Sequence, residues 1–599
     1  MCLTHLMHFA LLLIWMAIAA FLRFTHIADK PLWADEFSTL VFSLGNSFLS
    51  VPLDQGLTLN ELLQPLQPNS QATPVSVVHH LLSESNHPPL YFVLSHLWLR
   101  LFSPIDGFVS VWAARALSAV CGVLAVPASF GLSWLAWRSR LAAHLAAALM
   151  TVSPFGVYLA QEARHYTLAI LWILASLSCL VAVAQLIQTN RRIPLWLCCL
   201  WISVNGLGIA THYFVLLTLF AAAIALLLWL FLFSSPISLT SPLSLTSLTS
   251  ALPRLLFVAL GTLASALVWF PVLLSIRGTE LTRWIQTGEF DKSTWIDQLL
   301  RFVAGLITML YLLPVQEVPL PVIITSAVVL VLLLAWTVPL LVRGWRNQTQ
   351  QPETRSMLLL LGGFVITAIA LSLLLTFGLG VNFASVFRYQ FFYFPAVVLV
   401  VGGALAQGGR QKVEGRGVRE AFGETPGQEA EVRSQKPGEL GLAWVYGRWA
   451  IAGVLLFSLL GGITVANDLG YQRTHRPEKV AAAIHANFQH PALVAIPHKT
   501  HGHTGRLMGI AWELHRLNPA AANQTTFLLA HIPGQDPQPA IATLQRTVQS
   551  LPRPLDIWRV NFRSEANPLS QAVLSQAGCV PVTKLLSVDG YRYQKYTCG

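Results

Sequence analysis

The chain has 599 residues, of which 54% are hydrophobic and only 11% are charged. A soluble globular protein carries roughly 25% charged residues, so this composition excludes an ordinary soluble enzyme and indicates a chain mostly surrounded by lipid. The formal net charge of +11 does not indicate nucleic-acid binding, because an excess of Lys and Arg is usual in cytoplasmic loops. The cysteines lack CxxC spacing, which argues against a zinc or redox site.

Apolar runs of about 20 residues predict a polytopic helical bundle. The first, 7–24, is expected to be an uncleaved transmembrane helix with its short N-terminus inside, because no A-x-A-like cleavage site follows it. Two stretches of about 15 residues, 89–103 and 298–314, each carry an Arg and are expected to lie in the membrane interface. The other predicted spans are 112–136, 141–160, 165–188, 194–212, 213–234, 252–276, 319–343, 357–379, 388–407 and 443–466.

The distribution of basic residues supports this topology. If both short stretches are interfacial, the basic loop residues fall on the side of the N-terminus, which is the positive-inside pattern. The pattern therefore favours eleven spans with the C-terminus outside, and thirteen is the competing count. The basic residues concerned are Arg138, Arg140, Arg191, Arg192, Arg343, Arg346 and those in 410–419.

The domain organisation follows from the same pattern. A transmembrane region, 1–407, contains outer loops at 25–111 and 277–297, and 443–466 is the last transmembrane helix. Residues 408–442 are rich in Gly and in both charge signs, which is typical of a flexible cytoplasmic linker. Apolar runs alternate with helical stretches over 467–599, which predicts a small outer α/β domain. Two cysteines there, Cys579 and Cys598, could form a disulfide if the domain faces an oxidising compartment.

Polar residues at the ends of the predicted spans gather on the outer face. Charged residues near lipid are costly unless they are paired or lie in a water-filled cavity, so several on one face indicate a polar pocket. A solvated loop and a structural ion pair remain the simpler alternatives. The groups are Asp35-Glu36, His87-Pro88-Pro89, Gln161-Glu162-Ala163-Arg164, Thr211-His212-Tyr213 and Arg388-Tyr389.

The chain resembles the glycosyltransferase family 39 group, which includes protein O-mannosyltransferases and, more distantly, the bacterial aminoarabinose transferase of lipid A. The resemblance covers roughly residues 1–405 and is best in the first 215. It implies a mainly α membrane protein with the GT-C fold, a helical bundle with long outer loops that takes sugars from polyprenyl-phosphate donors. The matching blocks are WADE, NHPPLYFVLSHLW, SPFGVYLAQEARHYTL, THYF and FRYQFFYFPA.

The resemblance also implies roles for the acidic pair. Transfer of a sugar to a hydroxyl needs a base for the acceptor proton and a stabiliser for the departing phosphate. Asp35, the acidic residue of the first-loop motif, is expected to be the base of an inverting transfer. Glu36 is expected to position the acceptor or to tune its neighbour.

The remaining polar groups are candidates for binding the donor. Arg164 and Arg388 are expected to grip the lipid phosphate, because a guanidinium binds phosphate oxygens in a bidentate way, and Arg115 is a weaker candidate. Glu162 is expected to pair with Arg164, to bind sugar hydroxyls or to hold a metal. The residues expected to add hydrogen bonds are His87, His212 and Tyr389.

Cofactor and partners follow from this chemistry. No cofactor is certain, although Asp35, Glu36, His87 and Glu162 could offer oxygen and nitrogen ligands to a divalent metal ion. The expected partners are a polyprenyl-phosphate-linked sugar, membrane lipids and an acceptor lipid, glycan or protein, with no nucleic acid. The expected location is the inner cell membrane, with the active site on the periplasmic side. A transporter or flippase without transferase activity is the alternative from another functional class.

Overall fold

The computed structural model describes residues 2–234, 245–276, 295–381, 383, 386–408, 437–562 and 566–599. The predicted linker, 408–442, and the predicted outer loop, 277–297, lie almost entirely outside the described residues.

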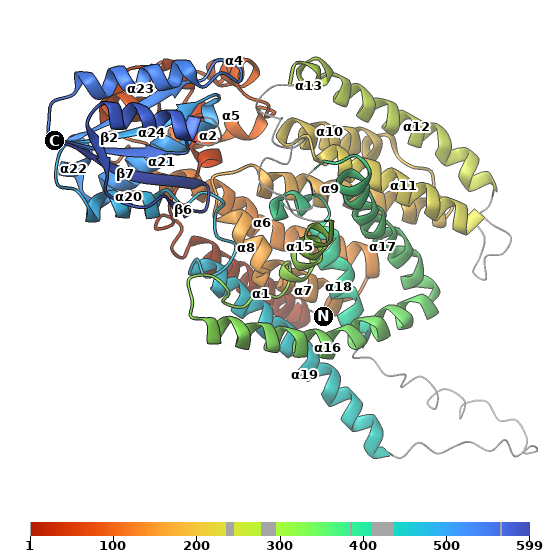
Figure 1. Cartoon of the computed structure of the whole chain (residues 1–599). Coiled ribbons are helices and arrows are strands. Elements are labelled where there is room, and N and C mark those ends of the chain that lie inside the picture. The colour runs from red at the N-terminus through yellow and green to blue at the C-terminus, as the bar shows by residue number, and fades with distance from the viewer. Residues whose placement is uncertain are drawn as a thin grey trace, which may run out of the picture.

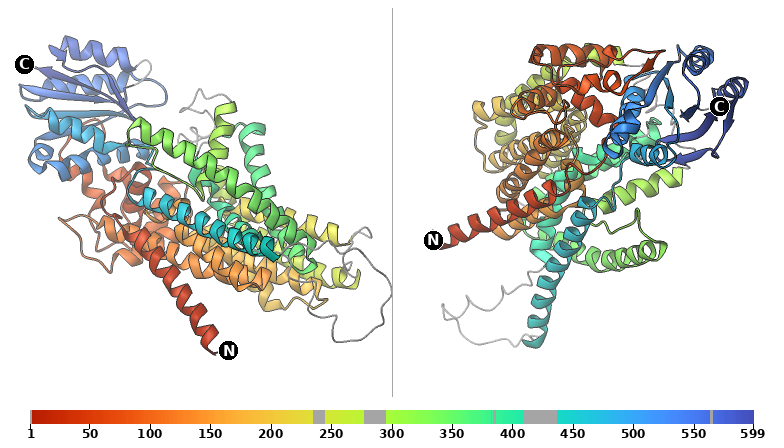
Figure 2. Two further views of the ribbon diagram at one scale, coloured as in Figure 1. Left: turned by 90° about the horizontal axis from the view of Figure 1, so that it is seen from below. Right: turned by 90° about the vertical axis from the view of Figure 1, so that its left-hand side faces the viewer.

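A bundle of apolar helices makes up most of the chain, and a sheet domain lies at one end of it (Figures 1 and 2). Among the described residues, eight helices are long and apolar enough to cross a membrane, or nine if the bent pair α7 and α8 is one span. The chain is therefore a multi-pass membrane protein. The helices of the bundle are α1 (Cys2–Phe24), α6 (Val111–Trp137), α7 (Arg140–Val152), α8 (Pro154–Ala160), α9 (Tyr166–Gln188), α10 (Leu195–Thr211), α11 (Val215–Ser234), α12 (Leu245–Leu267), α13 (Phe270–Ile276), α15 (Trp295–Thr308), α16 (Leu320–Gln350), α17 (Pro352–Leu373), the π-turn η3 (Leu374–Gly378), the 3₁₀ helix η4 (Phe387–Phe392), α18 (Phe394–Gly408) and α19 (Pro437–Ala466).

Among the described residues, fewer helices than the eleven expected spans are long and apolar enough to cross a membrane. Helices α10 and α18 coincide with the predicted spans 194–212 and 388–407, but they have only 17 and 15 residues. A bilayer core needs about 20 helical residues, so these two helices are short for a span. The stretch 89–103 contains a helix of ten residues, which is too short to span.

The first outer loop folds into a compact helical layer. Its helices start where the sequence supplies caps, because Thr58 and Thr73 each form a capping box with the residue three positions later. This layer carries the acidic pair at the start of its first helix. Its elements are α2 (Ala34–Ser43), η1 (Phe48–Ser50), β1 (Gly56–Leu57), α3 (Leu59–Leu63), η2 (Gln64–Leu66), α4 (Pro74–Glu84) and α5 (Leu90–Leu99).

The C-terminal domain is α/β, as the sequence predicts. Its sheet has the order β1-β3-β2-β4-β7-β5, with β6 paired to β7. Strand β2 is parallel to β3 and β4, whereas β7 is antiparallel to β4. Cys579 and Cys598 form a disulfide between β5 and β7. The elements are α20 (Pro477–Ala486), β2 (Ala492–His498), α21 (His501–Leu517), α22 (Pro519–Asn523), β3 (Thr525–His531), α23 (Gln538–Ser550), β4 (Leu555–Val560), α24 (Ala566–Gln576), β5 (Cys579–Pro581), β6 (Leu586–Val588) and β7 (Tyr591–Cys598).

The outer loop and the C-terminal domain are one folded unit. Strand β1 of the loop pairs antiparallel with β3, and Leu57 lies opposite Phe527. One hydrophobic core contains Leu62 and Val77 of the loop together with Leu507 of α21. The loop therefore contributes a strand to the sheet of the C-terminal α/β domain and side chains to its core.

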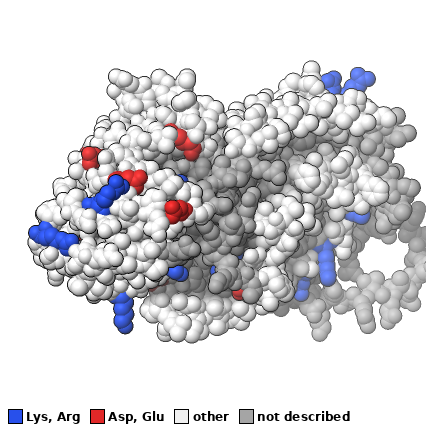
Figure 3. All heavy atoms as spheres, turned by 45° about the horizontal axis from the view of Figure 1, so that its top comes forward, with Lys and Arg blue, Asp and Glu red and all other residues white. Residues whose placement is uncertain are grey.

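Charged side chains are unevenly distributed over the surface. On the face shown in Figure 3 the acidic residues gather over the left-hand part, beside several basic residues, whereas the right-hand part shows only scattered basic residues among uncharged ones. We call the end of the bundle that meets the sheet domain the domain end. Lipid contact along the bundle and water contact at the domain end account for this division.

Candidate active site

The acidic pair lies in the first turn of α2, directly after Trp33. A helix N-terminus favours negative charge, so both carboxylates suit this position. Their surroundings differ, because 36% of the Asp35 side chain is exposed and the Glu36 side chain is completely buried.

Glu36 is held by a network that uses both of its oxygens. Arg115 donates from Nε to Oε1 at 2.7 Å and from Nη2 to Oε2 at 2.8 Å. The backbone N–H of Ala163 donates to Oε1 at 2.9 Å, and Arg473 Nε lies 3.7 Å from Oε2. These cations and hydrogen bonds hold the pKa of Glu36 below its ordinary value despite burial. Glu36 therefore fixes the start of α2 to α6 and to the turn between α8 and α9.

Arg115 also orders the chain that enters α2. Its Nη1 donates to the carbonyl oxygens of Ile27 and Lys30, and its Nη2 donates to that of Pro31. With Glu36 included, every nitrogen of the buried guanidinium has an acceptor. Arg115 is thus saturated and has no donor left for a ligand.

Asp35 faces two arginines that come from distant parts of the chain. Its Oδ2 lies 3.6 Å from Arg388 Nη2 and 3.9 Å from Arg164 Nη2. Both guanidinium groups are largely buried, and the Nε of each has no hydrogen-bond partner. A buried N–H group without an acceptor lowers the stability of the fold. These two Nε–H groups therefore indicate that a ligand or a water molecule supplies the missing acceptors.

Arg164 is oriented by its neighbours. Its Nη1 donates to the Asp35 carbonyl oxygen and to Thr39 Oγ1, at 3.0 and 3.1 Å. Its Nη2 lies 3.0 Å from His87 Nε2, which must accept because a guanidinium has no acceptor. The proton of His87 is then on Nδ1, which donates to Ser85 Oγ. Burial, followed by the charge of Arg164, lowers the pKa of His87 well below its ordinary value, in agreement with a neutral ring.

Arg388 is held by aromatic rings. It lies in η4, before α18 begins, and its guanidinium carbon is 4.5 Å from the centre of the Trp33 ring and 5.6 Å from that of Tyr389. Such cation–π contacts hold a guanidinium in place without using its N–H groups. The Tyr389 ring in turn packs edge-on against Phe214, at 4.8 Å.

Glu162 is a buried carboxylate without a hydrogen bond. Its side chain is almost fully buried and neither oxygen has a partner. Burial raises its pKa to about 7, although the nearby Arg473, Arg388 and Arg164 lower it. Of the expected roles of Glu162, the ion pair with Arg164 is not formed within 4 Å, and the Glu162 oxygens have no partner although the charges of Arg164 and Arg388 are near enough to act on them.

His212 is part of a cluster of rings beneath Arg164. Its Nδ1 accepts from the backbone N–H of Phe214 at 3.0 Å, and burial lowers its pKa to about 3. The ring of His165 lies 4.4 Å from it and 5.3 Å from that of His87. His165 is completely buried, and neither of its nitrogens has a partner. The cluster supplies neutral polar groups next to the cations.

Several residues of the site were missed by the sequence analysis. Arg473 follows the last span and reaches Glu36 and Asp468, each at 3.7 Å. Lys30 is buried and donates to Gln161 Oε1 at 2.6 Å, and burial lowers its pKa to about 7. His501 begins α21 and stacks on Phe48 at 5.2 Å. The run of basic residues just after the last span, in QRTHRPEK, is a signal that could have found Arg473.

The donor set fits a phosphate better than a metal ion. Among the described residues, no group of three or more His, Cys, Asp or Glu side chains is arranged to hold a metal. Both oxygens of Glu36 are occupied by Arg115, and Asp35 lies between two arginines. A divalent cation prefers several free oxygen ligands and no adjacent cations, so these residues do not suit one.

Comparisons with known proteins identify the fold. No family model and no curated protein matches the chain. The apo structure of ArnT from Cupriavidus metallidurans is 13% identical, with a TM-score of 0.51 over 98% of this chain and 97% of that one. ArnT bound to undecaprenyl phosphate aligns over the same shares with a TM-score of 0.50. The archaeal oligosaccharyltransferase AglB from Archaeoglobus fulgidus aligns with a TM-score of 0.43, at 12% identity, over 98% of this chain and 74% of that one.

The alignments with the two ArnT structures cover nearly the whole chain. They therefore include the helical bundle, the first outer loop and the C-terminal domain. Membership of glycosyltransferase family 39 in particular stays a prediction. The chain therefore has the GT-C fold that its sequence predicts.

Proposed function

We propose that the chain is a membrane glycosyltransferase that moves a sugar from a polyprenyl-phosphate donor to an acceptor hydroxyl. The support from comparison is the ArnT fold, since one ArnT structure contains undecaprenyl phosphate. The observation that carries the proposal is the pair Arg164 and Arg388, two buried guanidinium groups with unpartnered N–H groups on either side of Asp35. A lipid phosphate supplies the acceptors that these donors lack.

In this proposal Asp35 is the general base. Its carboxylate takes the proton of the acceptor hydroxyl while the acceptor oxygen bonds to the anomeric carbon of the sugar. The bond from that carbon to the phosphate oxygen breaks in the same step, so the anomeric configuration inverts. Asp35 suits this role because its side chain is the partly exposed member of the acidic pair. Glu36 touches no substrate and acts by fixing the first turn of α2.

The arginines stabilise the leaving phosphate. The negative charge on the phosphate grows as the sugar departs, and fixed guanidinium groups in a buried site stabilise that charge without reorganising. The rings of Trp33 and Tyr389 lie against the Arg388 guanidinium, and its buried Nε has no hydrogen-bond partner. His87 keeps Arg164 in place through the 3.0 Å hydrogen bond between Nη2 and Nε2.

Glu162 is proposed to bind the sugar. Its unpartnered oxygens lie near the charges of Arg164 and Arg388 and would accept hydrogen bonds from sugar hydroxyls. His212 is proposed as a further polar contact beneath the donor. No step of the proposed mechanism uses a metal ion, because Glu36 is saturated by Arg115.

The location and acceptor follow as proposals. We propose that the domain end, and with it Asp35, lies on the periplasmic side of the inner membrane, and the positive-inside pattern of the loops supports this proposal. The donor lipid then reaches the arginines from the membrane. The acceptor, a lipid, a glycan or a protein, enters beside α21, whose first residue His501 lies near Asp35.

Transfer by purified variants tests the proposal. Radiolabelled polyprenyl-phosphate sugars and a membrane extract as the source of acceptors give the assay. We expect Asp35→Asn to lower the rate by about 10²–10⁴, which is the usual range for loss of a general base. Arg388→Gln should lower kcat by about 10²–10³, the loss seen when one charge-stabilising donor is removed.

Asp29→Asn is the matched control, because Asp29 is an exposed carboxylate in the same loop that contacts only His26 among the ion pairs of the described residues. It should transfer at the wild-type rate. Full activity of Asp35→Asn would contradict the role of the base. Movement of lipid-linked sugars across reconstituted vesicles without any transfer would instead favour the transporter.

A further inference from the structure

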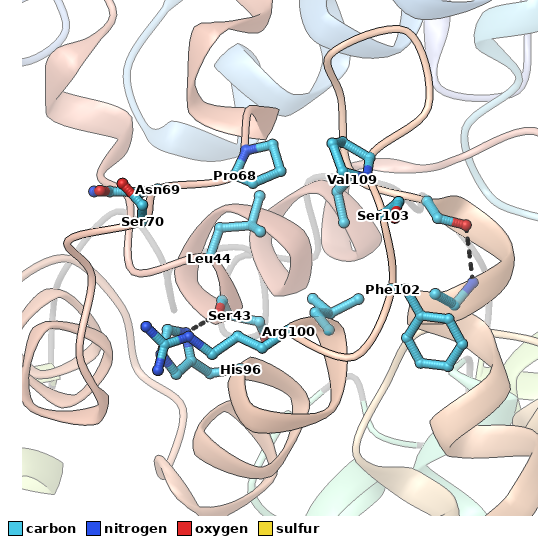
Figure 4. Close-up of a pocket in the computed structure, with 14 residues that line it drawn as sticks. Ser43, Leu44, Pro68, Asn69, Ser70, His96, Arg100, Phe102, Ser103 and Val109 are labelled. Atoms are coloured by element: carbon cyan, nitrogen blue, oxygen red, sulfur yellow. Dashed lines mark hydrogen bonds between the residues drawn. The ribbon is translucent and has the colours of Figure 1, made fainter.

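A second pocket lies at the opposite end of α2 from Asp35 (Figure 4). It encloses about 230 Å³ between the end of α2, the loop at 68–70, the end of α5 and the start of α6. A helix rises about 1.5 Å per residue, so Ser43 lies about 12 Å along the helix axis from Asp35. The pocket is therefore separate from the site described above.

The floor of the pocket contains polar atoms without partners. The hydroxyl of Ser43 is completely buried and makes no hydrogen bond. His96 is 3% exposed, and its Nδ1 donates to the Ser43 carbonyl oxygen at 2.8 Å. Its Nε2 is buried and unpartnered, and in the neutral ring this atom is an acceptor. The floor thus offers two places for a hydroxyl group.

A cation lies at the mouth. Arg100 is exposed, and its Nη2 makes a long contact of 3.4 Å with the Ala72 carbonyl oxygen. Within the described ranges, no carboxylate lies within 4 Å of its guanidinium. Arg100 follows His96 by four residues along α5, so both project from one helix face about 6 Å apart. Both side chains line the pocket (Figure 4).

The other face of α5 is apolar and exposed. Leu94 and Leu97 lie on it, followed by Leu101, which is 73% exposed. Trp112, at the start of α6, is also exposed. Exposed Leu and Trp side chains next to a basic residue are typical of the membrane–water interface, where lipid head groups lie. The mouth of the pocket therefore opens at the depth of the head groups.

We propose that this pocket binds the head group of an anionic phospholipid that carries free hydroxyls, of the phosphatidylglycerol type. The phosphate lies on Arg100, a glycerol hydroxyl donates to His96 Nε2, and the acyl chains lie along Leu97 and Leu101. Pockets for whole drug-sized ligands measure about 300–1,000 Å³, so this smaller pocket has room for a head group but not for a whole lipid. The proposal does not depend on the transferase activity.

Thermal unfolding of the full chain in detergent micelles tests this proposal. Adding dioleoylphosphatidylglycerol should raise the Tm of the wild type by roughly 3 °C or more, and dioleoylphosphatidylcholine should not, since only the former has an anionic polyol head group. Arg100→Gln should lose this rise. Arg192→Gln is the control, because it removes an equally exposed charge from the loop between α9 and α10 and should keep the rise.

A photoreactive phosphatidylglycerol locates the site directly. Cross-links to 68–70 or 99–104 would support the proposal, and cross-links confined to other segments would contradict it. An equal rise with phosphatidylcholine, or a full rise in Arg100→Gln, would also overturn it. A full rise with sn-glycerol 3-phosphate alone would overturn the assignment to a lipid.

Discussion

At the scale of single residues, burial separates two carboxylates that are adjacent in sequence. Asp35 and Glu36 are both acidic residues in the first turn of one helix, so the sequence alone could not divide their roles. Successive helix residues point about 100° apart, and only Glu36 faces Arg115 of the bundle. The side chain that the bundle leaves partly exposed is the one free to meet a substrate.

The first prediction concerns the stability of this arrangement. Glu36→Gln should lower the free energy of unfolding by about 3–5 kcal/mol, because it leaves the buried Arg115 charge without its partner. Asp35→Asn should lower that free energy by less, because Asp35 is partly exposed and makes only the longer contacts of 3.6 and 3.9 Å with its arginines. Thermal unfolding in detergent measures both. A wild-type midpoint for Glu36→Gln would contradict a stabilising role for the Glu36 carboxylate.

The second prediction concerns pH. Burial raises the pKa of Glu162 to about 7, from an ordinary value near 4.5 in the unfolded chain. The folded state therefore binds the proton more tightly, and its stability falls as the pH rises from about 4.5 to 7. Glu162→Gln cannot lose that proton, so its Tm should fall less than that of the wild type over this range. Thermal unfolding at pH 5, 6 and 7 gives the Tm of the wild type and of Glu162→Gln. If the Tm of both proteins changed equally with pH, the raised pKa of Glu162 would be contradicted.

At the scale of elements, close packing of α21 on α2 sets the position of the base. A Cβ added at Gly505 would lie 3.2 Å from the Ala34 carbonyl oxygen, which is tighter than ordinary contact. Only a residue without a side chain lets the two helices approach this closely. The start of α2 therefore rests on the backbone of α21.

The third prediction follows from this contact. Gly505→Ala should push the first turn of α2 by a few tenths of an ångström and lower the transfer rate several-fold, because catalysis is sensitive to small displacements of the base. Gly502→Ala is the control on the same helix, where an added Cβ meets only Thr500 Oγ1 at 3.5 Å. Equal rates for the two variants would show that α2 tolerates the shift.

The elements also show how far the sequence could predict the fold. Apolar runs placed nearly every bundle helix, because length and hydropathy are local properties. The run 141–160 was expected to be one span, but it is broken before Pro154 and bends by 55°. Arg23 donates to the carbonyl oxygens of Met150 and Thr151 beside this break. The acceptor of this hydrogen bond lies 127 residues from Arg23, so no local pattern in the sequence indicates the contact. The sequence therefore predicts only that Arg23 lies at the end of a span.

At the scale of the whole molecule, the polar residues of the site were easier to find than their partners. Charge near lipid is unusual, so Asp35, Arg164 and Arg388 stood out in the sequence. Arg473 and His501 did not, because they belong to a polar region where such residues are ordinary. The two-residue strand β1 was also missed, since its pairing with β3 joins segments about 470 residues apart and has no periodicity to detect.

The last prediction tests whether the outer loop and the C-terminal domain unfold together. Leu507 of α21 is completely buried in the core that contains Leu62 of the loop. Leu507→Ala should lower the free energy of unfolding by about 2–5 kcal/mol through the cavity it leaves. Because the outer loop and the C-terminal domain share one core, the backbone amides of 56–66 and of 492–531 should exchange faster together in this variant. The rate of sugar transfer should fall as well. If the loop kept its protection while the domain lost it, the two parts would be separate folding units, and the position of Asp35 would depend on the bundle alone.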